Sequence, residues 1–244
     1  MNSLGMTLVA SATVSLVYEV FMRMDIEHVL SERLAPGFAF GLSSKKRSEI
    51  DFLFLVKNAE DFLQIIGLSA NDILSPVPLN AIRGRLLNEK LFSVHILLIN
   101  PYSTEALLRS TSPAYSKPFM FFEKTKHIIS EISDLGSELR KKGIDHKHFD
   151  ARVYSTPATL SMIIDSSKAL VTPLAYHETG GRSHLFEVSA ASGSDSLYQH
   201  FMKHFETVWH SATPIIGTDL SMLELEASKF EEKLSTMRYD ESRK

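Results

Sequence analysis

The chain contains no cysteine among its 244 residues. This absence excludes disulfide bonds, zinc sites built from thiolates and catalysis by a thiol nucleophile. A positive surplus is also missing, because 26 Lys and Arg residues stand against 29 Asp and Glu residues, for a net charge of −3. Proteins that bind nucleic acids by neutralising many phosphates usually carry such a surplus. The composition therefore gives no strong nucleic-acid signal, although it leaves room for a local basic patch.

Glycine-rich phosphate loops of the Walker or dinucleotide type are absent, and the sequence shows no internal repeat. We therefore predict that the protein uses no cofactor. The length fits one large domain or two small ones. An apolar fraction of 44% and a charged fraction of 23% are those of an ordinary globular protein.

Charge is missing from the start of the chain, since Asn2 to Tyr18 contain no acidic or basic residue. Extended to Met22, the run reaches the ~20 residues that a helix needs to span a bilayer. No Lys or Arg precedes Arg23, as it would in a secretory signal peptide. We therefore expect residues 2–22 to form a single membrane span, with the following domain in the cytoplasm because the first positive charges come after the run. The alternative is a buried N-terminal helix of a soluble protein.

Changes in composition divide the chain into regions. The predicted regions are a membrane and juxtamembrane helix at 1–35, a linker at 36–48, a main domain at 49–214, and a C-terminal amphipathic helix with a polar tail at 215–244. The first helix is expected to end at Pro36-Gly37. The linker holds three adjacent cations, Lys45 to Arg47, which are expected either to be solvated or to contact anionic lipids.

The main domain alternates predicted strands and helices. Short apolar runs closed by turn residues indicate strands, and apolar residues three or four positions apart indicate helices. The expected strands lie at 61–70, 92–101, 151–156, 160–165, 168–174 and 184–189, and the expected helices at 78–91, 102–111, 121–143, 194–212 and 218–237. This order predicts an α/β fold in which a mixed β-sheet is flanked by helices.

Ligands of such sheets bind at the carboxyl ends of strands, which directs attention to the segments that follow the expected strands. The candidate ligand-binding residues there are Asn100, Tyr154, Thr156, Tyr176, His177, Arg182 and His184. The last four lie in one loop, where Gly180-Gly181 permits close approach of a ligand and the arginine reads anions. The expected partner is an anionic small molecule or a nucleotide. The alternative is an ordinary loop between two strands.

Ten histidines raise the question of a metal site. His146 and His148 are two residues apart beside Asp145, and His200 and His204 are four apart on a predicted helix. Neither pair comes with the three or four placed ligands that a zinc site needs. We therefore predict no metal site, and expect a solvated loop for the first pair and half-exposed packing for the second.

The order of these elements resembles a lobe of the phospholipase D-like family, over about Ile50 to Pro214. The hairpin PATLSMIIDSSKALVTP and a helix that closes with Val208-Trp209 and Ala212 carry the resemblance. In that family a complete site needs two lobes, and this chain has one. Because isolated lobes of this fold often pair, the resemblance implies a homodimer.

The family's hairpin reads H-x-K-x-x-x-x-D, in which the histidine attacks phosphorus and the lysine stabilises phosphate charge. Counting back from Asp165, these positions hold Ala158 and Leu160, and neither residue can fill the role. Asp165 itself is interpreted as a turn residue that bonds its own backbone. We therefore expect no catalytic residue at the family's site.

The leading hypothesis is a membrane-tethered, catalytically inactive phospholipase D-like domain that senses or binds a ligand, as in a bacterial stress or defence module. One alternative is a divergent phosphodiesterase or phospholipase-type hydrolase that uses His184 with Arg182 or His177. Another is a soluble scaffold domain whose N-terminal helix docks on a partner.

Overall fold

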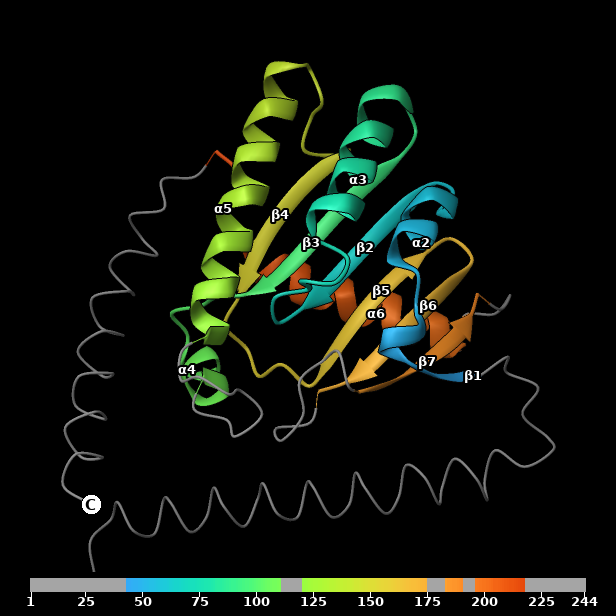
Figure 1. The fold of residues 1–244 in the computed structure, drawn as a ribbon, viewed down its shortest axis with the longest axis vertical. Helices are drawn as coiled ribbons and strands as arrows, with labels where there is room; N and C mark the ends of the chain where they lie inside the picture. The colour runs from blue at the N-terminus through green and yellow to red at the C-terminus, as the bar shows by residue number, and fades with distance from the viewer. Residues whose placement is uncertain (1–42, 111–119, 175–182, 191–195, 218–244) are drawn as a thin grey trace, which may run out of the picture. The chain divides into compact units, whose positions relative to one another are not determined.

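Eight strands form one mixed sheet in the order β1-β7-β6-β5-β2-β3-β4-β8 (Figure 1). The computed structural model describes residues 43–110, 120–174, 183–190 and 196–217. The strands are β1 (Ser43–Lys46), β2 (Phe62–Gly67), β3 (Ser93–Ile99), β4 (Phe149–Tyr154), β5 (Leu160–Asp165), β6 (Lys168–Pro173), β7 (His184–Ser189) and β8 (Thr213–Pro214). The helices are α2 (Phe52–Asn58), α3 (Pro76–Asn88), α4 (Thr104–Ser110), α5 (Met120–Lys141) and α6 (Leu197–Ser211). The predicted α/β fold with a mixed, helix-flanked sheet is confirmed.

The two kinds of strand pairing occupy different parts of the sheet. β2, β3 and β4 run parallel to one another. Parallel strands need a long crossover connection, which here contains α3 between β2 and β3 and α5 between β3 and β4. β5 is antiparallel to β2, and β6, β7 and β1 continue the antiparallel pairing to one edge. The short β8 is antiparallel to β4 at the other edge. The carboxyl ends of the parallel strands therefore meet the start of β5 and the end of β6.

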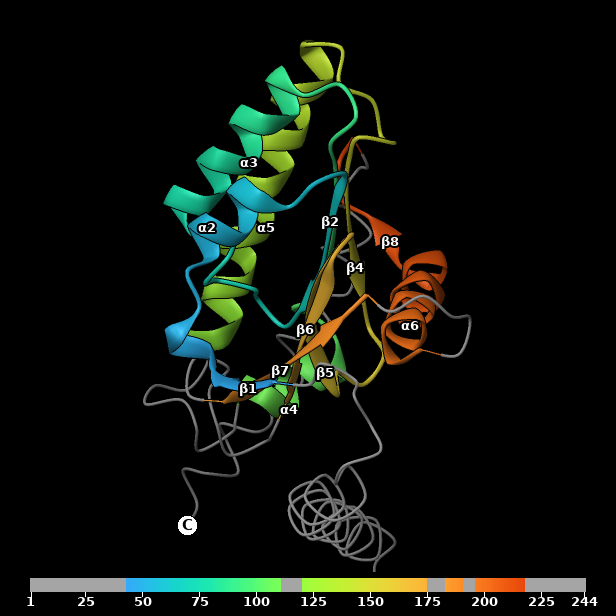
Figure 2. The same cartoon turned by 90° about the vertical axis from the view of Figure 1, so that its right-hand side faces the viewer.

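Helices cover both faces of the sheet: α2, α3 and α5 lie on one side and α6 on the other (Figure 2). Successive side chains of a strand point to opposite faces. In β2, Leu63 and Ile65 join the core beneath α2, α3 and α5, while Ile66 joins the core beneath α6. Burial on both faces explains why β2 and β3 appear as nearly continuous apolar runs in the sequence.

Local chemistry sets several helix ends. The carboxylate of Asp51 accepts a hydrogen bond from the Phe54 backbone N–H at 2.9 Å and starts α2. The hydroxyl of Ser196 accepts one from the Gln199 N–H at 3.2 Å and starts α6. After α5, Gly143 has φ +84°, a left-handed conformation that glycine adopts readily.

Four expectations in the first part of the domain need correction. Residues 43–46 fall in the predicted linker but form β1, which pairs with β7. Helix α2 lies where no element was expected. Arg47 was expected in a solvated or lipid-contacting loop and is instead only 6% exposed. The helix expected at 78–91 ends at Asn88, and Leu91 lies beyond it.

The predicted membrane span at 2–22 and the predicted helix at 218–237 lie outside the described residues. Within the described part of the chain, no helix has the length and apolarity needed to cross a bilayer.

Candidate functional site

The carboxyl edge of the sheet gathers several segments far apart in the sequence. β2, β3 and β4 end there at Gly67, Ile99 and Tyr154, because their parallel registers pair these regions. The antiparallel pairing of Leu160 with Pro173 brings the start of β5 and the end of β6 to the same edge. In Figure 1, α4 lies at this edge. The site residues predicted from the sequence are considered in this setting.

Asn100 organises the turn that follows β3. Its side-chain oxygen accepts from the Tyr102 N–H at 3.0 Å, and its amide nitrogen donates to the Ser155 hydroxyl at 3.2 Å. Its backbone carbonyl accepts from the Ser103 hydroxyl at 2.8 Å. Asn100 is only 3% exposed, so it joins the segments after β3 and β4 from inside the fold. A ligand contact by this side chain stays a prediction.

Tyr154 and Thr156 differ in their surroundings although both follow β4. The Tyr154 ring is buried beneath α6, and its hydroxyl donates to the Gly67 carbonyl at 3.3 Å. Burial, with a smaller contribution from the negative charge of Glu105, raises the Tyr154 pKa far above its usual value. Thr156 is exposed on the segment that leads to β5. Tyr154 therefore supports the edge as a neutral side chain, and Thr156 is accessible from solvent.

The hairpin of β5 and β6 holds the positions that carry the family resemblance. Ala158 is 4% exposed and packs in the core beneath α6, and Leu160 packs against the same core. The Asp165 carboxylate accepts from the Ser167 N–H at 2.7 Å, the Ser167 hydroxyl at 2.6 Å and the Lys168 N–H at 2.9 Å. The interpretation of Asp165 as a turn residue is confirmed, and it lies at the opposite end of β5 from Leu160.

Arg109 on α4 is a residue of this edge that the sequence analysis missed. Its guanidinium donates to the backbone carbonyls of Ala158 at 3.0 Å and Leu174 at 3.2 Å, and to the Glu105 carboxylate at 3.2 Å. The residue is 9% exposed. A buried cation thus lies against the backbone of the position where the family has its histidine. No local signal in the sequence distinguishes it from a surface arginine.

Arg47 is the second missed residue, and it joins both ends of the candidate loop 175–182. Its backbone N–H donates to the Ser183 carbonyl at 3.2 Å, just after the loop. Its guanidinium donates to the Thr172 hydroxyl at 3.2 Å, shortly before the loop, and to the Asp72 carboxylate at 2.7 Å. The guanidinium also lies 5.3 Å from the centre of the Phe52 ring. Arg47 therefore closes the base of the loop.

Only one of the four candidate residues of that loop region is described. His184 is the exposed first residue of β7, paired in register with Lys46 of β1. Tyr176, His177 and Arg182 lie outside the described residues. A ligand contact by these three residues remains a prediction. Arg47 holds Thr172 and Ser183, the described residues on either side of their loop.

Neither histidine pair assembles a metal site in the described residues. No group of three or more His, Asp or Glu side chains with metal-binding geometry occurs there. Both ring nitrogens of His148 are engaged, Nδ1 with Asp145 at 2.7 Å and Nε2 with the Lys90 carbonyl at 3.0 Å. On α6, desolvation and then the neighbouring His200 lower the pKa of His204. The first pair lies in a turn whose residues 145–147 are exposed, as expected for a solvated loop, and Asp145 orders its backbone.

The carboxyl edge combines two apolar side chains, two buried arginines and one exposed histidine. The positions of the family's nucleophile and phosphate-binding lysine carry a methyl group and an isobutyl group. Arg47 and Arg109 are each paired with one carboxylate, Asp72 and Glu105, so each of these pairs is neutral overall. His184 is a solvent-accessible imidazole at the same edge.

No family profile and no curated protein matches the sequence. Solved structures are similar in fold. Phosphatidylserine synthase from Haemophilus influenzae Rd KW20 aligns with a TM-score of 0.50 and 14% identity, over 83% of this chain and 47% of that one. Nuc, a phospholipase D family member from Salmonella typhimurium, aligns at 0.42 and 10%, over 71% and 95%. TrmBL2, an archaeal chromatin protein, aligns at 0.41 and 12%, over 85% and 67%.

The chain thus spans about half the length of the phosphatidylserine synthase structure, whose alignment is the one of these three that reaches a TM-score of 0.50. At such low identity the likeness concerns the fold alone. The sheet order, the two helical layers and this likeness together lead to one conclusion: the described domain has a phospholipase D-like fold.

Proposed function

We propose that the protein is a membrane-tethered binding or sensing domain that takes an anionic ligand at the carboxyl edge of its sheet, without the catalysis of the phospholipase D-like family. The observation that supports this most directly is at Ala158. Its side chain packs in the core, and its carbonyl accepts from Arg109. The catalytic histidine's place is therefore occupied by core packing, and no imidazole is available there to attack phosphorus.

In this proposal the ligand contacts the loop 175–182 through Tyr176, His177 and Arg182, with His184 and Thr156 beside it. Asn100 and Tyr154 are buried and do not contact the ligand. Their hydrogen bonds hold the segments of this edge in position. Because Arg47 and Arg109 are each paired with a carboxylate, Arg182 is the cation proposed to bind the anion, such as a phosphate ester or a nucleotide. The tether is the segment 2–22, and the domain is cytoplasmic.

A thermal-shift screen of the full chain in mild detergent tests the ligand. The probes are inorganic phosphate, ATP, inositol trisphosphate and a short oligonucleotide. A ligand at 100 times its Kd stabilises the native state by about 2.7 kcal/mol, which corresponds to a rise in Tm of several degrees. We expect Arg182→Ala to abolish the shift and Lys203→Ala, at an exposed position on α6, to preserve it. The absence of a shift with every probe would contradict small-anion binding.

The hydrolase alternative makes a different prediction. A phosphodiesterase assay with bis-p-nitrophenyl phosphate should show no turnover above background in our proposal. Turnover that disappears in His184→Ala and persists in Lys203→Ala would replace the binding proposal with a divergent enzyme.

Carbonate extraction of cell membranes tests the tether. An integral segment keeps the protein in the membrane pellet, and detergent releases it. Release by carbonate alone would instead favour a scaffold whose first helix docks on a partner.

A further inference from the structure

Two turns lie side by side at the amino edge of the sheet, the end opposite the candidate ligand site. Residues 89–92 join α3 to β3, and residues 142–148 join α5 to β4. The parallel pairing of β3 with β4 brings the two turns together. The His148 ring bonds the Lys90 carbonyl at 3.0 Å, and the Val94 N–H donates to the His148 carbonyl at 2.7 Å.

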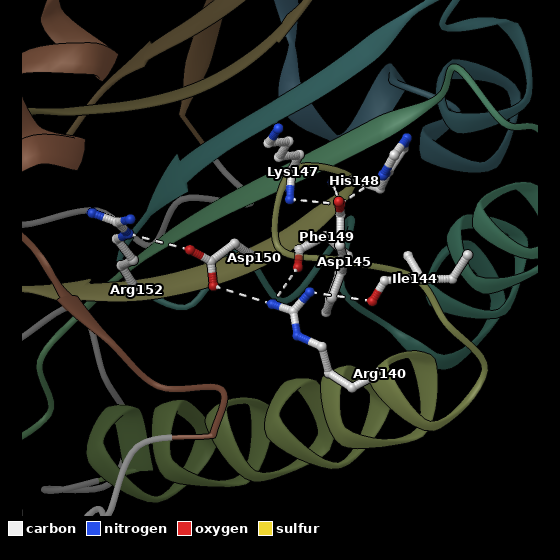
Figure 3. A network of polar contacts seen from close by, with 8 residues as sticks. All are labelled: Arg140, Ile144, Asp145, Lys147, His148, Phe149, Asp150 and Arg152. Atoms are coloured by element: carbon white, nitrogen blue, oxygen red, sulfur yellow. Dashed lines mark hydrogen bonds and ion pairs between the residues drawn. The ribbon is translucent and has the colours of Figure 1, made fainter.

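The second turn is held in place by an internal polar network (Figure 3). The Asp145 carboxylate accepts from the Lys147 N–H at 2.9 Å and bonds His148 Nδ1 at 2.7 Å. Arg140 donates to the carbonyls of Ile144 at 3.2 Å and Phe149 at 3.1 Å. The turn therefore presents its outward side chains from a defined backbone.

The same network uses up the acidic groups and leaves cations exposed. Residues 140–152 contain five Lys and Arg against two Asp, a local charge of +3 in a chain of −3. Asp150 is shared by Arg152 and Arg140, at 3.3 and 4.0 Å, and Asp145 is bound to His148. Lys90, Lys141 and Lys147 are exposed and have no ion partner among the described residues.

Unpaired acids on this edge lie to one side of the lysines. Glu60 and Asp61 precede β2, which neighbours β3, and the Asp61 carbonyl accepts from the Ser93 N–H at 3.0 Å beside the first turn. The nearer Glu89 is bonded to Arg85. The positive charge is therefore concentrated on the segment that leads from α5 into β4.

An exposed leucine follows Lys90 in the first turn. Leu91 is 85% exposed, more than any other large hydrophobic side chain in the described residues. Single exposed leucines are common, but this one follows Lys90 at the tip of a turn. An exposed leucine beside lysines matches the two parts of an anionic membrane surface, which offers acyl chains beneath charged headgroups.

We propose that the turns 89–92 and 142–148 bind an anionic lipid bilayer, with Leu91 entering the interface and Lys90, Lys141 and Lys147 contacting headgroups. The contact does not depend on the predicted span at 2–22. It would orient the amino edge toward lipid and leave the carboxyl edge facing away. A nucleic acid would use the lysines but has no place for the exposed leucine.

The absence of cysteine allows a site-specific test with the full chain. An environment-sensitive fluorophore is attached to Leu91→Cys, and in separate samples to the exposed control positions Ser130→Cys on α5 and Thr207→Cys on α6. The samples are mixed with vesicles of phosphatidylcholine alone or with 30% phosphatidylglycerol. We expect a blue shift only at position 91 and only with the anionic vesicles. Raising the salt should weaken the response, because surface charges are screened.

Charge variants test the role of the lysines. In the labelled Leu91→Cys protein, Lys141→Gln and Lys147→Gln should each raise the lipid concentration for the half-maximal response roughly fivefold. Lys203→Gln on α6 serves as the control and should leave it unchanged.

Three outcomes would overturn the proposal: no shift at position 91, equal shifts at all three positions, or a response to a short DNA duplex that exceeds the response to vesicles. Insertion of the segment 2–22 into neutral vesicles would not produce the expected pattern. Failure of this contact is therefore distinguishable from failure of the tether or of ligand binding.

Discussion

Arg47 shows how far the role of a single residue depends on distant partners. Lys45 and Lys46 beside it are exposed, whereas Arg47 is buried. The difference follows from the guanidinium, which can donate to several acceptors at once and is weakly hydrated. Its side-chain partners, Asp72 and Thr172, lie 25 and 125 residues away, so adjacent sequence cannot reveal them.

Removing the Arg47 side chain should destabilise the domain substantially. Arg47→Gln leaves Asp72 and Thr172 without their donor and is expected to lower the free energy of unfolding by about 1–3 kcal/mol. The matched control is Lys45→Gln, whose ion pair with Glu187 is exposed and worth less than about 1 kcal/mol. Urea denaturation measures both. Equal losses would contradict the role assigned to Arg47.

Asp165 gives a second prediction at this scale. One oxygen, Oδ1, accepts all three hydrogen bonds of the turn, and an asparagine retains a side-chain oxygen. We expect Asp165→Ala to lower the free energy of unfolding by about 1–3 kcal/mol, and Asp165→Asn to lower it much less. If asparagine proves as harmful as alanine, the negative charge matters more than the turn geometry.

His95 predicts a dependence of stability on pH. Its ring lies 4.9 Å from the Trp209 ring, and burial lowers its pKa, with the carboxylate of Asp150 opposing the shift and Arg152 adding to it slightly. Because the unfolded chain binds the proton more tightly, the contribution of His95 is complete above its ordinary pKa of about 6.5 and is lost as pH falls through the lower folded pKa.

Urea denaturation at pH 7.5 and 5.5 measures this effect. We expect His95→Gln to reduce the loss of stability between the two pH values. His204, whose pKa is also lowered by burial, contributes with the same sign, so His204→Gln is measured beside it. An unchanged pH dependence in His95→Gln would show that His95 is not responsible.

At the scale of elements, long periodic segments were predictable and short ones were not. The α5 pattern placed Ile128, Ile132, Leu135 and Leu139 inward, and all four are buried. β1 has the sequence SSKK, which carries no apolar alternation, and becomes a strand only because β7 pairs with it. For α2, the Asp51 cap was a usable local signal.

The segment after α6 depends on a glycine in another helix. Ile216 packs against Gly136 of α5, where a Cβ atom would lie 2.5–2.8 Å from three Ile216 side-chain carbons. Gly136→Ala should therefore displace Ile216 and lower the free energy of unfolding by about 1–3 kcal/mol. Hydrogen exchange at the Ile215 N–H, which bonds the Ala151 carbonyl, should quicken.

A double variant provides the control. Adding Ile216→Ala removes the clashing atoms, so the cost of Gly136→Ala should be smaller in that background. Equal costs in both backgrounds would mean that Ile216 does not limit the space at Gly136.

At the scale of the whole molecule, the order of elements was enough to predict the fold. Only some of the residues at the candidate site could be predicted. The site lies where strands end, as the general rule for such sheets predicts. Its two buried arginines escaped notice because charge, without knowledge of the fold, indicates a surface position. His184 became a candidate because it follows a sequence rich in glycine and polar residues, and the structure places it, exposed, at the start of β7.

A homodimer is the prediction that belongs to this scale. Light scattering of the full chain, corrected for detergent, should give a mass of twice the 27.4 kDa chain across micromolar concentrations. A mass of one chain would contradict the pairing that the single lobe implies, without bearing on ligand binding.

The position of β1 also has a kinetic consequence. Lys45 and its partner Glu187 are 142 residues apart, so β1 must wait for most of the chain to be made before it can pair. Closing so long a loop is entropically costly, which makes such contacts late ones in folding. Once β7 has been made, it is itself an open edge until β1 pairs with it, and it can pair with another nascent chain. The expected weak point of this protein is therefore not its finished surface but the interval of synthesis before β1 and β7 meet.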